Sequence, residues 1–244
     1  MRNIWIIARR EFNAYFNTPI AYVLTAMILI VVGIIMAANI SYAMQQPGFA
    51  PGGDVVTTTV IFLLVFAIPA LTMRLLADET RLGTIELLLT SPVRDLEVVI
   101  GKWLGAMLFI LTVLGFTLIY LLMLNTMVDP GIDFGLVWAG YLGLVLASST
   151  LVAIGLAISS FFSSLVATFL ATMGSFVVIW FLLAIPGQLG NGPMAEFFRY
   201  LDFRGHFLTM AGGVLELTDI LYYVSAIVLF LLVGAVSLET RRWR

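Results

Sequence analysis

The sequence contains no cysteine, a single histidine and few charged residues. Of its 244 residues, 11% are Asp, Glu, Lys or Arg and 61% are hydrophobic, whereas soluble domains carry about 25% charged residues. The mean hydropathy of +1.09 excludes a water-soluble globule, because one core could not hide so much apolar surface, and it excludes intrinsic disorder. The lack of cysteine excludes disulfides and thiolate metal sites. A net charge of -2 gives no indication of nucleic-acid binding.

Motifs for nucleotide binding and hydrolysis are also absent. Gly101-Lys102 lacks the upstream glycine of a phosphate-binding loop and is followed by Trp103, so ATP cannot bind through that motif. No H-E-x-x-H or G-x-S-x-G pattern occurs. Inside the expected spans we count one ionisable group, Arg74, close enough to an end to reach the membrane surface. We therefore expect a non-enzymatic chain that binds no metal or cofactor and is moved by another protein.

Long runs of apolar residues make up most of the sequence. A membrane-spanning helix needs about 20 apolar residues. The charge-free run 134–195 has 62 residues, about 93 Å as a straight helix, so it must fold back, and the serine-rich stretch 159–164 is the expected break. We predict an all-α polytopic membrane protein, with one domain over 1–244 and six spans near residues 20–43, 55–76, 98–124, 134–158, 165–185 and 220–238.

The positions of Lys and Arg indicate the orientation. If both termini are cytoplasmic, 10 of the 12 basic residues fall on the inner side and 2, Arg199 and Arg204, on the outer side. Cytoplasmic loops carry the excess of Lys and Arg. The distribution therefore favours six spans with both ends inside.

Residues 1–17 have the pattern of an amphipathic helix. Trp5, Ala8 and Phe12 share one arc of the helix, and Arg2 and Arg9 share the other. Such a helix lies in the cytoplasmic interface of the bilayer. Two interpretations stay open: the helix only anchors the first span, or it is an elbow helix that contacts a cytoplasmic partner through Arg2, Trp5, Arg9 and Phe12.

The stretch 77–97 is the longest expected cytoplasmic segment. Within it, the spacing of Ile85, Leu88 and Leu89 predicts a short helix over Thr84–Thr90 that presents leucines to the cytoplasm. Exposed leucines need apolar cover. They either fold back onto the membrane surface or insert into a groove on a second protein.

The loop 187–219 is the longest on the outer side. Neither of its halves can span a membrane, and both are expected to dip into the outer leaflet as a re-entrant segment of short helices, broken at Gly205 and at Gly212-Gly213. His206 lies in this loop, and we interpret it as a structural residue.

Two stretches resemble a known family. The run from Pro69 to Val93, PALTMRLLADETRLGTIELLLTSPV, resembles the second span and coupling-helix signature of type-2 ABC exporter permeases. The stretch from Phe198 to Trp243 looks like the outer re-entrant segment, last span and basic tail of that family. The similarity covers essentially the whole chain. The opening ARREFNAYFNTPIAYVL is similar to the gliding-motility-associated, GldF-like branch.

The resemblance implies partners and a location. Such permeases pair as two six-span halves, identical or homologous, in the bacterial cytoplasmic (inner) membrane, with two copies of a separate ABC ATPase that bind ATP and magnesium. GldF-like members resemble subunits that work with a companion carrying a large outer domain. The coupling helix seated in the ATPase would comprise Gly83, Thr84, Ile85, Glu86, Leu87, Leu88, Leu89 and Pro92.

Two functions are consistent with these features. The first is a permease subunit, an exporter driven by its ATPase. The alternative is a non-transporting permease that transmits ATP-driven motion to a partner on the outer face. Serine and threonine side chains in the spans suit helix packing better than cargo binding, and the absence of buried charge disfavours a highly charged small cargo.

Overall fold

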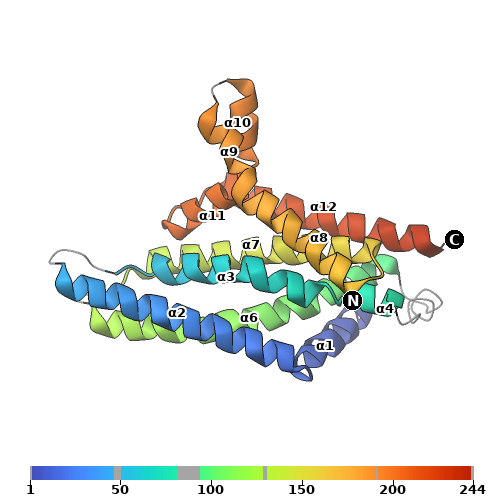
Figure 1. Cartoon of the computed structure of the whole chain (residues 1–244), viewed down its shortest axis with the longest axis horizontal. Coiled ribbons are helices and arrows are strands. Elements are labelled where there is room, and N and C mark those ends of the chain that lie inside the picture. The colour runs from blue at the N-terminus through green and yellow to red at the C-terminus, as the bar shows by residue number, and fades with distance from the viewer. Residues whose placement is uncertain (1, 47–50, 82–93, 129–130, 191, 243–244) are drawn as a thin grey trace.

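The computed structural model describes residues 2–46, 51–81, 94–128, 131–190 and 192–242, and within these ranges the secondary structure is helical, without strands (Figure 1). Six helical segments are long and apolar enough to cross a membrane. The prediction of an all-α protein with six spans is confirmed. The helices are α1 (Arg2–Phe16), α2 (Pro19–Gln45), α3 (Asp54–Thr72), α4 (Ala77–Arg81), α6 (Asp95–Met127), α7 (Phe134–Phe161), α8 (Leu165–Val177), η1 (Val178–Leu182), α9 (Ala184–Leu189), α10 (Pro193–Tyr200), α11 (Phe203–Ala211) and α12 (Leu217–Arg242).

The bundle has two distinct ends. Helices α1 and α4 and the last turns of α12 gather at one end, which we call the terminal end (Figure 1). The start of α3 and the end of α6 lie at the opposite end, the far end. The two ends of the chain are therefore on the same side of the bundle, as an even number of spans requires.

Helix α7 lies at the centre of the bundle. Helices α3, α6, α11 and α12 pack against it, and most of its side chains are buried. Small residues allow this close packing: a Cβ added at Gly155 would lie 2.3 Å from the Thr72 hydroxyl oxygen of α3. Small residues let membrane helices approach closely where lipid provides no hydrophobic driving force between them.

The second span contains a break. The expected span to residue 76 lies within the candidate span Asp54–Glu79, in which α3 ends at Thr72 and a turn leads into α4. Two backbone N–H groups after this turn, those of Leu76 and Ala77, donate to the Ser159 hydroxyl of α7 at 3.1 and 3.0 Å. The hydroxyl thus accepts from N–H groups at the start of α4, where the first N–H groups of a helix have no partner within the helix.

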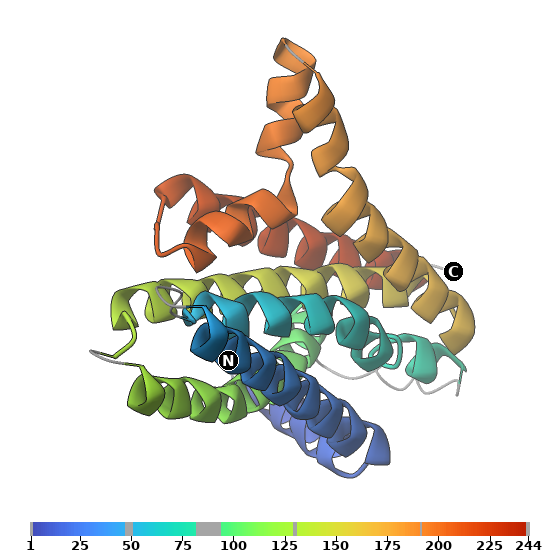
Figure 2. The ribbon, with the colours of Figure 1, turned by 60° about the vertical axis from the view of Figure 1, so that its left-hand side comes forward.

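The fifth span, expected over 165–185, is present as the candidate span Leu165–Leu189 and consists of three helical segments. Helix α8 continues into the π-helical turn η1, where the Leu183 N–H donates to the Val178 carbonyl at 3.0 Å, and α9 extends to Leu189. Such turns break the regular helical geometry. Helix α8 leaves the bundle obliquely, and α9 and α10 form a hairpin that projects away from it (Figures 1 and 2). The Arg199 guanidinium of α10 donates to the Gly187 carbonyl of α9 at 2.8 Å.

The segment before the last span contains two short helices, α10 and α11. The expected break at Gly205 is wrong, because Gly205 lies inside α11. The Asp202 side chain accepts from the Gly205 N–H at 3.0 Å and so caps α11 three residues earlier. The expected break at Gly212-Gly213 is present: α11 ends there, and Gly213 has a φ of 87°, a conformation that glycine adopts without steric cost.

Candidate functional site

Helix α1 lies across the first turns of α6 at the terminal end. The contact centres on two glycines of α6, Gly101 and Gly105. A Cβ at Gly101 would lie 2.8 Å from the Ile7 side chain, and one at Gly105 would lie 2.9 Å from the Ala8 carbonyl oxygen. The motif Gly101-Lys102-Trp103-Leu104-Gly105 therefore forms the close-approach surface that small-xxx-small patterns provide in membranes.

The amphipathic helix expected over 1–17 is present as α1. Ala8 is fully buried, and Phe12 packs against the core beside Phe16 at a ring distance of 5.0 Å. Trp5, on the same arc, is 59% exposed. Arg2 and Arg9 are exposed. The interpretation of Arg2, Trp5, Arg9 and Phe12 as an elbow interface stays a prediction.

A buried ammonium joins three helices at this contact. The Lys102 side chain on α6 is 2% exposed, and its Nζ lies 2.9 Å from Glu11 Oε1 of α1 and 2.8 Å from Glu79 Oε1 of α4. The Arg10 guanidinium lies 3.1 and 3.3 Å from the same two oxygens but is 60% exposed. We call Arg10, Glu11, Glu79 and Lys102 the Lys102 cluster. It balances two cations against two carboxylates.

The charges in the Lys102 cluster depend on one another. Burial by itself would raise the pKa of the Glu11 carboxyl, but the nearby Lys102 and Arg10 charges outweigh burial and hold this pKa below its usual range. Glu11 is therefore ionised at neutral pH. A buried charge pair of this kind is costly to break, because loss of one partner leaves the other uncompensated.

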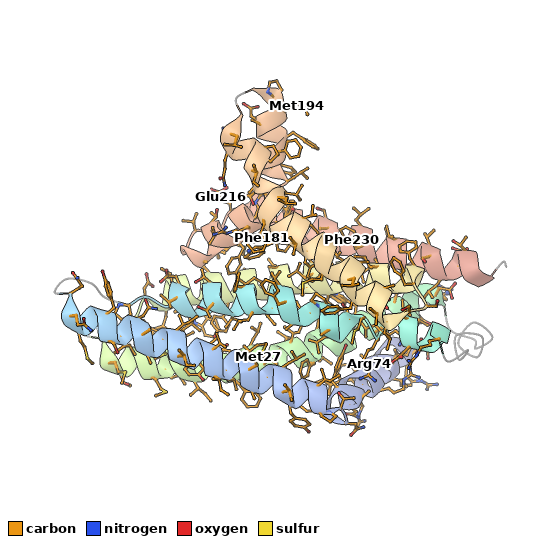
Figure 3. The ribbon with its side chains drawn as sticks, viewed as in Figure 1. Met27, Arg74, Phe181, Met194, Glu216 and Phe230 are labelled. Atoms are coloured by element: carbon orange, nitrogen blue, oxygen red, sulfur yellow. The ribbon has the colours of Figure 1, made fainter. Side chains whose placement is uncertain are left out.

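Helix α4 is fixed to its neighbours by further contacts. Asp78 accepts from the Arg74 guanidinium at 3.2 Å and pairs with Arg81 at 3.1 Å. Figure 3 places Arg74 beside the α1–α2 elbow. Helix α4 is attached to α1 and α6 because Glu79 belongs to the Lys102 cluster. It is attached to α7 because the Ala77 N–H donates to the Ser159 hydroxyl. The expected coupling residues Gly83, Thr84, Ile85, Glu86, Leu87, Leu88, Leu89 and Pro92 follow α4 directly and lie outside the described residues.

Several polar side chains within the spans are hydrogen-bonded inside their own helix or to a neighbouring helix. Thr112, Thr150 and Thr168 each donate to the carbonyl four residues earlier, and Thr117 bonds to Tyr141 of α7 at 2.8 Å. Across the described ranges, no group of three or more His, Asp or Glu side chains could hold a metal ion. The terminal end, with its buried charges and helix crossings, is therefore the candidate functional site.

Comparison with known proteins agrees with this architecture. A family model described as "ABC-2 family transporter protein" matches residues 5–243. The chain belongs to this family. It is accordingly a multi-pass membrane protein and a permease subunit of an ABC transporter, a membrane transport component that associates with an ABC ATPase subunit. No curated protein matches the chain.

Sequence reasoning missed the residues that organise the terminal end of this ABC-2 chain. We counted Arg74 as the one ionisable group within the spans, which is wrong, because Lys102 lies inside the expected span 98–124 and is buried in α6. Gly101-Lys102 was considered only as a failed phosphate-binding loop. The four-residue spacing of Gly101 and Gly105 was the available signal for a helix crossing.

The far end of the ABC-2 chain holds a second polar contact between helices, which involves the single histidine. His206 Nδ1 of α11 lies 2.6 Å from Asp219 Oδ1 of α12, and His206 Nε2 lies 2.9 Å from the Tyr200 carbonyl oxygen. The Tyr222 ring stacks on the imidazole with a centroid distance of 4.3 Å. His206 thus ties the segment before the last span to that span.

Replacing His206 with alanine is expected to lower the free energy of unfolding by about 2 kcal/mol, the value of a hydrogen bond to a charged group. The reason is that Asp219, which is 3% exposed, loses its partner. Unfolding in mixed detergent–SDS micelles measures the change. The double variant His206→Ala/Asp219→Ala should lose less than the sum of the single variants, and additive losses would show that the two side chains do not interact.

Proposed function

We propose that this chain is the permease subunit of an ABC exporter and that a separate ATPase drives it through residues 83–92, with the terminal end facing the cytoplasm. The observation that carries the proposal is the attachment of α4, which directly precedes this segment, to three other helices. Glu79 contacts Lys102 of α6 and shares it with Glu11 of α1. Ser159 of α7 holds the turn before α4.

This arrangement favours mechanical transmission from the segment to the bundle. A short helix attached by one flexible loop would move alone when a partner pushed on it. Helix α4 instead carries buried ionic contacts to α1 and α6 and backbone hydrogen bonds to α7. Packed interfaces of this kind move between discrete arrangements rather than deform continuously. ATP-driven displacement of residues 83–92 would therefore shift α1, α6 and α7 together.

The orientation and the assembly follow from the same proposal. Basic residues concentrate at the terminal end, as they do on cytoplasmic sides, and the chain would lie in a bacterial cytoplasmic membrane with both termini inside. A second permease half and two ATPase copies would complete the transporter. Membership of the gliding-motility-associated branch stays a prediction.

A substitution in the coupling segment tests the proposal. Replacing Leu88 with glutamate is expected to abolish co-purification of the ATPase, because a charge in an apolar groove loses its solvation. Leu215→Glu, at an exposed position between α11 and α12, is the matched control and should retain the ATPase. The chain without its ATPase should not hydrolyse ATP. An intact complex with Leu88→Glu, or ATP hydrolysis by the chain alone, would refute the proposal.

One feature favours the alternative of a non-transporting permease that acts on an outer partner. The α9–α10 hairpin projects from the bundle, with Met194 near its tip (Figure 3), and its apolar side chains Leu189, Met194, Phe197 and Tyr200 are exposed. Such a patch suits either the outer leaflet or a companion protein. Flux of cargo into vesicles supports the exporter, whereas ATPase activity that needs an outer companion and moves no cargo supports the alternative.

A further inference from the structure

Two cavities adjoin along α6, close to α1. The first, of about 530 Å³, lies between α1 and α6, and Trp5, Arg9, Asn13, Leu111 and Thr112 are among the residues that line it. We call it the headgroup cavity. The second, of about 340 Å³, lies between α2 and α6. We call it the apolar cleft. Thr112 lines both, so the two cavities are neighbours.

The headgroup cavity carries one positive charge and no negative charge. Arg9 is its single ionisable lining residue. Arg10, Arg74 and Arg81 each pair with a carboxylate, whereas Arg9 has no carboxylate within ion-pair distance in the part of the chain that the structure describes. Asn13 adds a hydrogen-bonding side chain to the same lining. An anionic group therefore complements this cavity.

The described lining of the apolar cleft is mostly apolar, with Tyr22 and two threonines as its residues that carry a hydroxyl. Its lining includes Ala26 of α2 together with Phe109 and Phe116 of α6. The Thr25 and Thr112 hydroxyls donate to carbonyls of their own helices at 2.8 and 2.9 Å. A groove with these walls fits a hydrocarbon chain rather than a polar ligand.

The two cavities lie in order of depth. Helix α1 crosses α6 at Gly101 and Gly105, and Phe116 lies 11 positions beyond Gly105 in the sequence. At ~1.5 Å per residue this is about 16 Å along α6, roughly half of a hydrocarbon core of about 30 Å. Arg9 is therefore placed at the membrane surface and the end of the apolar cleft near the middle of the bilayer.

We propose that the headgroup cavity and the apolar cleft together bind one anionic phospholipid. Its phosphate would contact Arg9 and Asn13, and one acyl chain would run past Thr112 into the cleft. The amphipathic helix α1 would then be held on α6 partly by a specific lipid. The lone positive charge at the surface end matches a phosphate, and the apolar walls at the deep end match an acyl chain.

Native mass spectrometry tests this proposal. The protein is purified with its ATPase from nanodiscs that contain equal amounts of phosphatidylglycerol and phosphatidylethanolamine. The wild type should retain phosphatidylglycerol preferentially. Arg9→Gln should lower the retained ratio of phosphatidylglycerol to phosphatidylethanolamine by about fivefold, which is the value of one arginine near an anionic lipid surface. Arg94→Gln, an exposed arginine at the start of α6, is the matched control and should leave the ratio unchanged.

A second pair of variants tests the deep end. Ala26→Phe fills the apolar cleft and should reduce retained lipid, whereas Val23→Phe, exposed on the same helix and outside the cleft lining, should not. Equal lipid ratios in Arg9→Gln and Arg94→Gln, or unchanged lipid in Ala26→Phe, would overturn the proposal.

A second copy of the chain is the competing occupant of the cleft. Because the sequence has no cysteine, Ala26→Cys introduces a unique thiol. Disulfide-linked dimers formed by Ala26→Cys in vesicles would show that a second copy fills the cleft and would overturn the lipid proposal. A lack of such dimers, together with selective phosphatidylglycerol retention, would support it.

Discussion

Replacing Lys102 with methionine is expected to lower the free energy of unfolding by about 3 kcal/mol, the lower part of the range for removing one partner of a buried ion pair. Methionine keeps most of the side-chain volume but removes the charge. The Glu11 and Glu79 carboxylates, which share Lys102 at 2.9 and 2.8 Å, would then repel each other without the buried cation between them. Unfolding in mixed detergent–SDS micelles measures the loss, and ATPase stimulation by the complex should fall with it.

Arg10→Met is the matched control for Lys102→Met. Arg10 contacts the same two carboxylate oxygens at 3.1 and 3.3 Å but is 60% exposed, and exposed pairs contribute about 0 to 1 kcal/mol. The double variant Glu11→Gln/Lys102→Met should recover part of the stability, because it removes one uncompensated carboxylate. Equal losses in Lys102→Met and Arg10→Met would contradict the role of burial.

Substitution of Gly105 by leucine should separate α1 from α6. The added Cβ would lie 2.6 Å from Glu11 Cβ and 2.9 Å from the Ala8 carbonyl oxygen, which is backbone and cannot rotate away. We expect a loss of about 3 kcal/mol, the upper part of the usual range for overpacking. Limited proteolysis should cleave α1 faster, because the helix would no longer be held against α6.

Gly115→Leu controls for the change of residue type. Gly115 lies on the same helix and is exposed, and a Cβ there would have no neighbour within 4 Å. Leucine favours a helix over glycine by close to 1 kcal/mol, so stability should be unchanged or slightly higher. If both leucine variants lose stability equally, the close approach of α1 at Gly105 is not the cause.

Most of the membrane architecture was readable from the sequence. A span requires a long apolar run, and this requirement is strong enough to give the six segments without tertiary information. The amphipathic pattern of the N-terminal residues likewise gave α1. The family signature from Pro69 to Val93 agreed with the family model that matches residues 5–243.

The geometry of the site was less predictable, because it depends on which helices meet. Lys102 looks like an ordinary basic residue at a membrane surface until Glu11 and Glu79, from distant parts of the chain, are placed beside it. The π-helical turn at Val178–Leu182 and the end of α3 at Thr72 are equally hard to predict from the local sequence. They depend on packing and on donors such as the Leu76 N–H that find their acceptor on another helix.

The Lys102 cluster also bears on how the N-terminal helix should be regarded. Helix α1 precedes the first span, and its position at the edge of the bundle suggests that it could be deleted without loss of stability. It supplies Glu11, one of the two carboxylates on an almost fully enclosed ammonium. Deleting α1 would both strip apolar cover from α6 and leave that ammonium with one counterion. In energetic terms the first helix is therefore an interior element, although it lies at the periphery of the molecule.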